Sequence, residues 1–334
     1  MTGMMRKLLV PVWLGLFVVG LAIHRITGRT PRLCYHAMRR LYGPTRGYFN
    51  RLALSLARRA RPLAPPGTLH GFLGDFSPAE VDAIVQRIDR DGYAVFDRSA
   101  PPELVQELLR FAREQPSLPM GTAEAVAYAQ DPERALRYDF AEQAILANPA
   151  ACRIALDGTF AEIAGAYFRC LPVYDFTAMW WTTRFGSKHY SQAAQEFHFD
   201  MDRLAFLKFF IYLTDVTPDS GPHVFVAGSH RAKPDALAEP SRFDDALVQA
   251  HYPAEDIRQL CGPAGTIFAV DTVGIHKGMP VVAGDRLAFQ VEFATSLFGQ
   301  NYPAPTVAPA VLAQAGIAAP LDARVFGRIH QAAA

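Results

Sequence analysis

Polar and apolar residues alternate between Gln195 and Asp202: positions 196, 198, 200 and 202 are polar, and positions 197, 199 and 201 are apolar. A period of two is typical of a β-strand with one wet face and one buried face. His198 and Asp200 would then project from the same face, so that an imidazole and a carboxylate approach one point. A strand that carries an ordinary His–Asp hydrogen bond is the simpler alternative.

The patterns elsewhere predict helices in the first half of the chain and short strands in the second. Ser77, Pro78 and Glu80 form a helix start with serine as the N-cap, and this helix ends at Asp91-Gly92. The further elements expected are a strand at 93–96, a helix at 101–114, helices near 139–147 and 149–168, strand regions at 173–185 and 198–214, a short strand at 225–227, an insertion at 232–262 with a helical piece, and strands at 266–270 and 287–293. Helices followed by many short strands with Gly/Pro turns are typical of a jelly roll or barrel.

The amino terminus has a different pattern. Leu8–Ile23 is a run of sixteen residues without a charge, preceded by Arg6 and Lys7 and followed by arginines at 25, 29, 32, 39 and 40. The run is shorter than the roughly 20 residues of a comfortable membrane span. No small-residue cleavage site follows it, which favours a single-pass or in-plane anchor over a signal peptide; a buried helix is the third alternative. The arginines favour a cytoplasmic location for the carboxyl side, at the cell inner (cytoplasmic) membrane.

The pattern also suggests three regions. Residues 1–69 form the anchor and an arginine-rich linker that ends in a proline cluster at 62–67, residues 70–300 form the globular domain, and residues 301–334 form an Ala/Pro-rich tail.

Composition narrows the classes of function. A hydrophobic fraction of 50% in 334 residues supports a large core. The formal net charge of +1 provides no global field to attract nucleic acid, so no nucleic-acid partner is expected. The four cysteines, at 34, 152, 170 and 261, have neither C-x-x-C spacing nor a dense framework, which predicts reduced thiols in a cytosolic setting.

Two downstream segments carry further candidate chemistry. His276 follows a glycine turn and the apolar strand 266–270, a context that suits a ligand at a barrel edge, although a surface turn would also fit. Arg286 begins another alternating segment whose polar face also holds Glu292. A buried guanidinium requires an anionic partner, which could be Glu292, another side chain or the distal carboxylate of 2-oxoglutarate.

Three other polar residues are less clear in the sequence. Lys208 lies within an otherwise apolar stretch, where it would either extend from a strand end or pair with an anion in a pocket. His223 and His230 occupy the turns around one short strand, where capping or surface roles are more usual.

The ordered set of these segments resembles the phytanoyl-CoA dioxygenase-like Fe(II)/2-oxoglutarate oxygenases. The resemblance extends over about 70–300. The segments that carry it are Asp91 to Phe96, His198-Phe199-Asp200, Leu207 to Val216, Ser220 to His223, Gly228-Ser229-His230, His276 and Arg286.

This resemblance implies a mainly β fold with helices, built on a double-stranded β-helix (jelly-roll) core. His198, Asp200 and His276 would bind Fe(II) as a facial triad, with O2 and 2-oxoglutarate as co-reactants. Arg286 would hold 2-oxoglutarate, and Lys208 and Thr183 are further candidates for the cofactor site.

One position departs from the family pattern: Ala288 stands where such enzymes often have a serine or threonine. A second contact to 2-oxoglutarate must then come from elsewhere. The presence of Asp200 favours oxygenation over halogenation.

The function expected is therefore hydroxylation of an unactivated C–H bond of a small molecule. The apolar amino-terminal segment favours a lipid or acyl compound as the substrate. A non-catalytic, cupin-like jelly roll that binds a ligand is the alternative.

Overall fold

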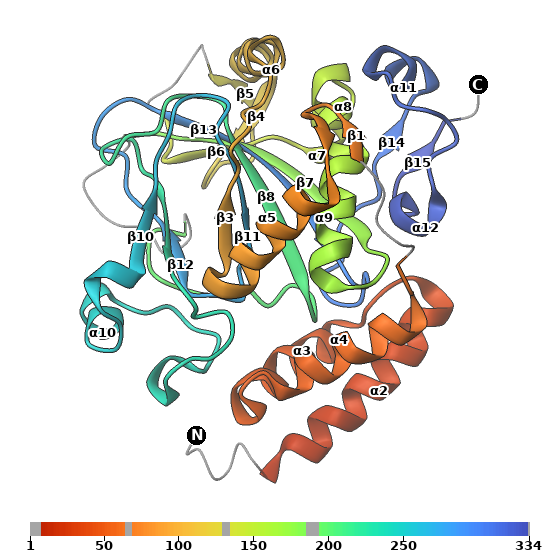
Figure 1. Cartoon of the computed structure of the whole chain (residues 1–334), viewed down its shortest axis with the longest axis vertical. Helices are drawn as coiled ribbons and strands as arrows, with labels where there is room; N and C mark the ends of the chain where they lie inside the picture. The colour runs from red at the N-terminus through yellow and green to blue at the C-terminus, as the bar shows by residue number, and fades with distance from the viewer. Residues whose placement is uncertain (1–7, 64–68, 129–133, 185–193, 333–334) are drawn as a thin grey trace.

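The computed structural model describes residues 8–63, 69–128, 134–184 and 194–332. Arg6, Lys7 and the 64–67 part of the predicted linker lie outside these ranges, as does Phe185 at the end of a predicted strand region. Within the ranges the chain is a mixed α/β structure with a large antiparallel sheet, consistent with the expected jelly-roll oxygenase fold (Figure 1).

The large sheet has eight strands in the order β3-β11-β8-β13-β7-β6-β4-β5, and a smaller sheet has the order β10-β9-β12. The bounds of the first are β3 Tyr93–Val95, β4 Pro116–Pro119, β5 Val126–Ala127, β6 Arg137–Asp139, β7 Val173–Thr182, β8 Phe206–Tyr212, β11 Ile267–Val270 and β13 Arg286–Ala294. Those of the second are β9 His223–Val226, β10 Ile257–Leu260 and β12 His276–Gly278. Because neighbouring strands are mostly far apart in sequence, the pairing brings together distant segments, for example Val270 of β11 with Tyr93 of β3, 177 positions apart.

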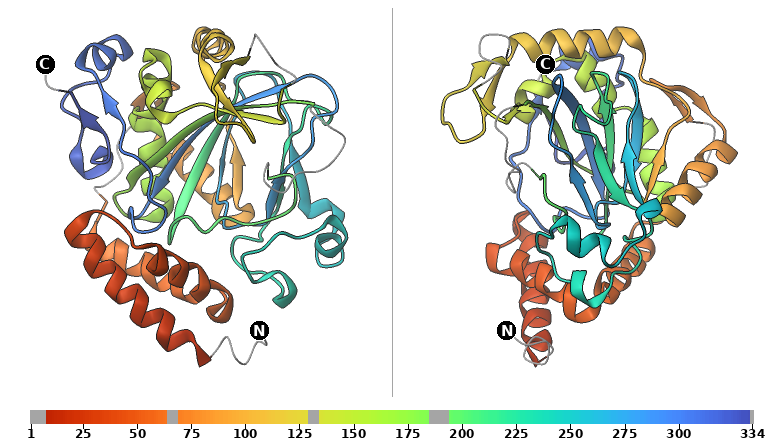
Figure 2. Two further views of the ribbon diagram at one scale, coloured as in Figure 1. Left: turned by 180° about the vertical axis from the view of Figure 1, so that it is seen from behind. Right: turned by 90° about the vertical axis from the view of Figure 1, so that its left-hand side faces the viewer.

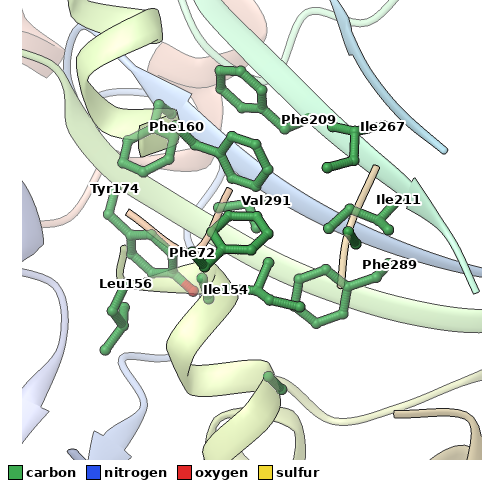
Figure 3. Close-up of a cluster of buried hydrophobic side chains, with 14 of the residues drawn as sticks. Phe72, Ile154, Leu156, Phe160, Tyr174, Phe209, Ile211, Ile267, Phe289 and Val291 are labelled. Carbon is green, nitrogen blue, oxygen red and sulfur yellow. The ribbon is translucent and has the colours of Figure 1, made fainter. Parts of the chain in front are cut away.

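The two faces of the large sheet have different partners. Along β8, Leu207, Phe209 and Ile211 belong to the main hydrophobic core, whereas Phe210 and Tyr212 belong to a separate cluster on the opposite face. The core face is covered by helices that contribute Phe160 and other side chains (Figure 3). These helices are α5 Pro78–Asp91, α6 Pro102–Glu114, α7 Glu142–Leu146, α8 Pro149–Ala155 and α9 Gly158–Phe168. These helices do not cover the opposite face, which lines the cavity described below.

Three helices at the amino terminus form a layer beside the sheets: α2 Val10–Thr27, α3 Arg32–Thr45 and α4 Tyr48–Ala60 (Figures 1 and 2). Helix α2 is long and apolar enough to cross a membrane. Length and composition alone are weak evidence, because core helices and signal sequences pass the same test.

The carboxyl-terminal residues are folded as well. They form β14 Thr306–Val307, α11 Pro309–Ala315, α12 Ala323–Phe326 and β15 His330–Gln331. Leu312, Val325 and Ile329 are buried in the main core. The three-region division stays a prediction, but this part of the predicted tail packs against the domain.

The remaining elements are short. They are β1 Leu69–Gly71, β2 Gly74–Phe76 and α10 Asp245–Gln249, with 3-10 turns at Asp235–Leu237 and Ala254–Asp256.

Local signals in the sequence located helix starts well. Ser77 and Glu80 form the predicted capping box at the start of α5. The prediction of one helix over 149–168 was wrong: α8 ends at Ala155, and Asp157 caps a new helix by accepting a hydrogen bond from the Thr159 amide. The aspartate side chain competes with the helical backbone at that point, which favours a cap over continuation.

The segment 195–202 has the predicted alternation but not the predicted strand. Phe197, Phe199 and Met201 are buried in one cluster, as the period of two requires. The segment makes isolated bridges, Phe197 with Phe243 and His198 with His276, instead of a continuous ladder.

Candidate metal and cosubstrate site

The side chains of His198, Asp200 and His276 converge. One ligand atom from each lies within 4.8 Å of the others. The two histidine backbones exchange hydrogen bonds of 2.9 and 2.8 Å, which places the residues opposite each other although 78 positions separate them in the sequence. The Nε2 atoms of His198 and His276 lie 3.7 and 3.6 Å from the Asp200 carboxylate oxygens.

The hydrogen bonds of the two histidines fix their tautomers. Nδ1 of His198 lies 2.8 Å from the Glu196 carbonyl oxygen, and Nδ1 of His276 lies 3.0 Å from the Gly274 carbonyl oxygen. A carbonyl oxygen only accepts, so Nδ1 carries the proton and Nε2 keeps its lone pair. Burial, together with the neighbouring His276, lowers the pKa of His198 to about 3, and burial lowers the pKa of His276. Both imidazoles are therefore neutral at pH 7, as metal ligation requires.

Asp200 is held by Lys208, whose Nζ donates to Asp200 Oδ2 at 2.8 Å. Although burial alone would raise it, the pKa of Asp200 falls well below its usual range because Lys208 and the two histidines surround the carboxyl. Lys208 also lies 3.5 Å from Glu292 and 3.9 Å from Asp202. Lys208 is thus buried in the pocket and paired with anions, which answers the open question about its orientation. The contacts found are to protein carboxylates, and a contact with 2-oxoglutarate stays a prediction.

Glu292 belongs to this buried network and not to Arg286. Its Oε2 lies 3.5 Å from Lys208 Nζ, no ion pair joins it to Arg286 in the described part of the chain, and burial raises the pKa of its carboxyl well above the usual range. Behind it, Asp175 forms a fully buried ion pair with Arg203, with Nε to Oδ2 at 2.6 Å. Glu292 is therefore excluded as the anionic partner that Arg286 was expected to need.

Arg286 begins β13 with a buried side chain. Its Nη1 donates to the Gly221 carbonyl, its Nη2 donates to Thr182 Oγ1 at 3.2 Å, and its Nε has no partner among the described residues. Within the described part of the chain no carboxylate pairs with it, and burial lowers its pKa. A buried guanidinium with unused donors is costly unless an anion completes it, which leaves the guanidinium available for a bound carboxylate.

Thr182 is the hydroxyl-bearing residue that contacts Arg286. It lies directly opposite Arg286 in the β7–β13 register, while Ala288 lies opposite Trp180. Thr183, the residue predicted from the sequence, donates a hydrogen bond from its Oγ1 to the Ala135 carbonyl at 2.7 Å. Neither threonine is among the residues that line the cavity, and a contact of Thr183 with 2-oxoglutarate stays a prediction. The sequence could not select Thr182, because the choice depends on which strand pairs with β13.

His223 is a site residue that the sequence analysis missed. It begins β9, is buried, and stacks on His276 with ring centroids 5.3 Å apart. Its expected role in a surface turn was wrong, because β9 pairs with both β10 and β12 and is enclosed. Its Nε2 has no hydrogen-bond partner among the described residues, and burial lowers its pKa well below the usual value.

A cavity of about 320 Å³ connects these groups. One wall is aromatic and the other is charged. The aromatic wall includes Trp180, Phe210 and Phe268, and the charged wall includes Lys208, Glu292 and Arg242. Arg137, whose charge is paired with Asp139 at 2.7 Å, stacks over Trp180 in the same lining. The arrangement can hold one metal ion beside one anionic cosubstrate, away from bulk water.

Comparison with known proteins agrees with this geometry. Residues 88–286 match the family described as phytanoyl-CoA dioxygenase (PhyH). That match spans more than half of the chain, so the chain belongs to this family of Fe(II)- and 2-oxoglutarate-dependent non-haem enzymes. Its cofactors are those of the family, Fe(II) and 2-oxoglutarate, with a His-Asp-His triad in place.

Several solved structures are similar to the chain. SnoN, described as a non-haem alpha-ketoglutarate-dependent epimerase from nogalamycin biosynthesis, has 17% identity and a TM-score of 0.47 over 65% of this chain and 84% of its own. HygX from Streptomyces hygroscopicus, with nickel and 2-oxoglutarate bound, has 16% identity and a TM-score of 0.43 over 66% and 87%. EctD from S. alaskensis, with bound Fe, has 17% identity and a TM-score of 0.45 over 70% and 82%. No curated protein sequence matches the chain.

Proposed function

We propose that this protein is a hydroxylase that uses Fe(II), 2-oxoglutarate and O2 to oxidise an unactivated C–H bond of a small molecule. The observation that carries the proposal is the pair of histidines whose Nδ1 atoms are committed to backbone carbonyls, with both Nε2 atoms directed at Asp200. Two neutral imidazoles and one carboxylate on one face are the donor set of non-haem Fe(II) oxygenases. His198, Asp200 and His276 would hold the metal.

Each side chain of the site has a distinct task in this proposal. Lys208 binds Oδ2 of Asp200, near His276, and so orients the other oxygen, Oδ1, toward His198. Arg286 binds the distal carboxylate of 2-oxoglutarate, and Thr182 accepts a hydrogen bond from its guanidinium and so positions it. The aromatic wall excludes water, which strengthens both electrostatic contacts. Bound iron would activate O2, which is the oxidant, while 2-oxoglutarate would supply two of the four electrons that O2 accepts and the C–H bond the other two; the chain supplies binding and orientation.

The size of the cavity supports a small substrate, or the end of a longer one. A volume of about 320 Å³ is at the lower limit for ligand sites, and 2-oxoglutarate would occupy part of it. A lipid or acyl compound that inserts one end is compatible with this limit and with the apolar amino terminus.

The direct test is release of succinate from 2-oxoglutarate, measured together with anaerobic Fe(II) titration. His198→Ala and His276→Ala should each lose stoichiometric iron binding and succinate release, while their circular dichroism stays unchanged. His251→Ala, at an exposed position outside the cavity, is the matched control. Full iron occupancy in both cavity variants would refute the ligand assignment.

We also propose that the amino-terminal segment holds the enzyme at the cytoplasmic membrane, with the catalytic domain in the cytoplasm. The apolar helix α2 and the arginines that follow it support this location. Fe(II) and 2-oxoglutarate are both cytosolic reagents, which is consistent with the same side. Sedimentation of the full chain with membranes tests the attachment.

A further inference from the structure

Helix α2 is packed against the body of the protein along one side. Phe17, in its middle, contacts Phe49 of α4 and Phe298 of the body, with ring centroids 4.7 and 5.0 Å away. Gly20 approaches α3 so closely that an added Cβ would lie 2.4 Å from Cys34 Cβ. The middle of α2 is therefore not free to leave the protein surface without breaking these contacts.

The end of α2 is fixed as well. Thr30, just after the helix, donates its amide to Asn301 Oδ1 at 3.0 Å and accepts the Asn301 side-chain amide at 2.8 Å. Its hydroxyl accepts the Gly299 amide at 3.0 Å. Helix α2 is thus attached at its middle and at its carboxyl end to the segment 298–301.

The opposite side of α2 is apolar and exposed. Val18 is 62% exposed, Val19 is 54% exposed and Ile26 is 85% exposed. Among the described residues, every exposed large hydrophobic side chain except Leu118 and Val282 lies between positions 8 and 56. Exposed apolar residues are normally scattered, so this concentration indicates a surface that meets another apolar phase.

Charge is also distributed unevenly between the amino-terminal layer and the body. The first 74 residues contain twelve basic side chains and no acidic one, whereas the whole chain has a formal charge of +1, so residues 75–334 carry −11. Arg25, Arg29, Arg32, Arg40 and Arg59 form no ion pair with a carboxylate in the described part of the chain. A strongly basic layer with an apolar face is the composition that binds an anionic lipid surface.

We propose that α2, α3 and α4 form a monotopic platform that lies in the plane of an anionic phospholipid bilayer, with α2 inserted by its outer face and not crossing the membrane. This inference rests on the proposed membrane attachment and specifies its form. A spanning α2 would have to separate Phe17 from Phe298 or draw the acidic body into the bilayer. A second copy of the chain is a poorer occupant, because pairing α2 with α2 would bring together two layers that each hold twelve basic side chains and no acidic one.

The first experiment measures binding of the purified full chain to vesicles. Binding should be strong with phosphatidylcholine containing about 30% phosphatidylglycerol and should fall with added salt. Val18→Glu should weaken it at least tenfold. Val282→Glu, which is also at a valine 62% exposed, is the matched control and should leave it unchanged. The double variant Arg29→Gln/Arg32→Gln should weaken binding roughly thirtyfold, and Arg113→Gln/Arg153→Gln, at exposed positions of the body, should not.

The second experiment determines the topology. In inside-out membrane vesicles from expressing cells, protease should remove both an amino-terminal tag and the body, because an in-plane platform keeps both on one side.

A protected tag would show a spanning helix and overturn the in-plane platform while leaving membrane attachment intact. Failure to bind either type of vesicle would overturn both, and equal binding to vesicles of phosphatidylcholine alone would overturn the anionic requirement. A stable lipid-free dimer that buries Val18 would assign the face to a second copy instead. Succinate release is scored separately, so none of these outcomes depends on the catalytic proposal.

Discussion

The two oxygens of Asp200 have different surroundings. Oδ2 accepts a 2.8 Å hydrogen bond from Lys208, and Oδ1 faces Nε2 of His198 at 3.7 Å. The ammonium fixes the carboxylate plane and compensates part of its charge within a buried site. The candidate ligands are thus oriented by groups one step further from the metal: a lysine for Asp200, and backbone carbonyls for the two histidines.

Arg286→Ala should raise the 2-oxoglutarate concentration needed for half-maximal succinate release by about one to two decades. The reason is the loss of a charge-assisted contact worth roughly 1.5–3 kcal/mol. Iron affinity should stay nearly unchanged. Arg137→Ala is the matched control, because that guanidinium lines the same cavity but is already paired with Asp139. An unaltered requirement for 2-oxoglutarate in the Arg286 variant would leave Arg286 a structural residue.

Helix α3 packs directly against the segment that carries His198 and Asp200. Tyr42 of α3 packs against Phe199 with ring centroids 5.1 Å apart, and Lys233 Nζ donates to Tyr42 Oη at 2.8 Å. The ammonium also lies 4.3 Å from the centroid of the Phe199 ring. Burial lowers the pKa of Lys233 from 10.5 to about 7, so the folded protein binds this proton less tightly than the unfolded chain.

The free energy of unfolding should therefore rise with pH between about 7 and 9.5, because there the unfolded chain holds more protons than the native one. In Lys233→Met that rise should be smaller by about 2 kcal/mol, a fraction of the full pKa difference since the side chain is partly exposed. Urea unfolding at the two pH values measures the difference. Arg231→Met, two residues away and exposed, should keep the wild-type pH dependence. A Lys233→Met variant with the same slope as wild type would contradict the argument.

Elements that depend on local chemistry were predictable, and their pairing was not. The capping box of α5 and the alternation of β13 are written in neighbouring residues, so both were found from the sequence. The positions of His223 and Thr182 depend on which strands pair: His223 reaches the site because β9 pairs with β12, and Thr182 because β7 pairs with β13. No short-range pattern encodes those registers, so the sequence indicated the candidate ligands His198, Asp200 and His276 but not these two neighbours.

At the scale of the whole molecule, the amino-terminal helices cover part of the body. Met38 and Leu41 pack with Leu204 and Phe298, all of them buried, and Asn50 donates to the Leu204 carbonyl at 2.8 Å. The amino-terminal region is thus an integral part of the folded structure.

A chain beginning at Leu69 should unfold at a lower temperature than the full chain. Each large apolar side chain that it uncovers, Leu204 and Phe298 among them, loses burial worth about 1.5–3 kcal/mol. A chain beginning at Arg29 retains α3 and α4 and should lie between the two. Calorimetry on the three chains in the same detergent measures the order of their unfolding temperatures. Equal unfolding temperatures would mean that the helices contribute no stability to the body.

One contact joins the amino-terminal helices to the candidate metal site. Tyr35 of α3 donates its hydroxyl to Asp202 at 3.3 Å, two residues after Asp200, and Asp202 lies 3.9 Å from Lys208. Thermodynamic linkage requires reciprocity between two such binding events. If binding of α3 to a lipid surface changes the affinity for Fe(II) through this contact, iron loading must change the affinity for the lipid surface by the same factor. The size of this coupling free energy has to be measured. Vesicle binding measured with and without metal should give the same value as metal titration measured with and without vesicles.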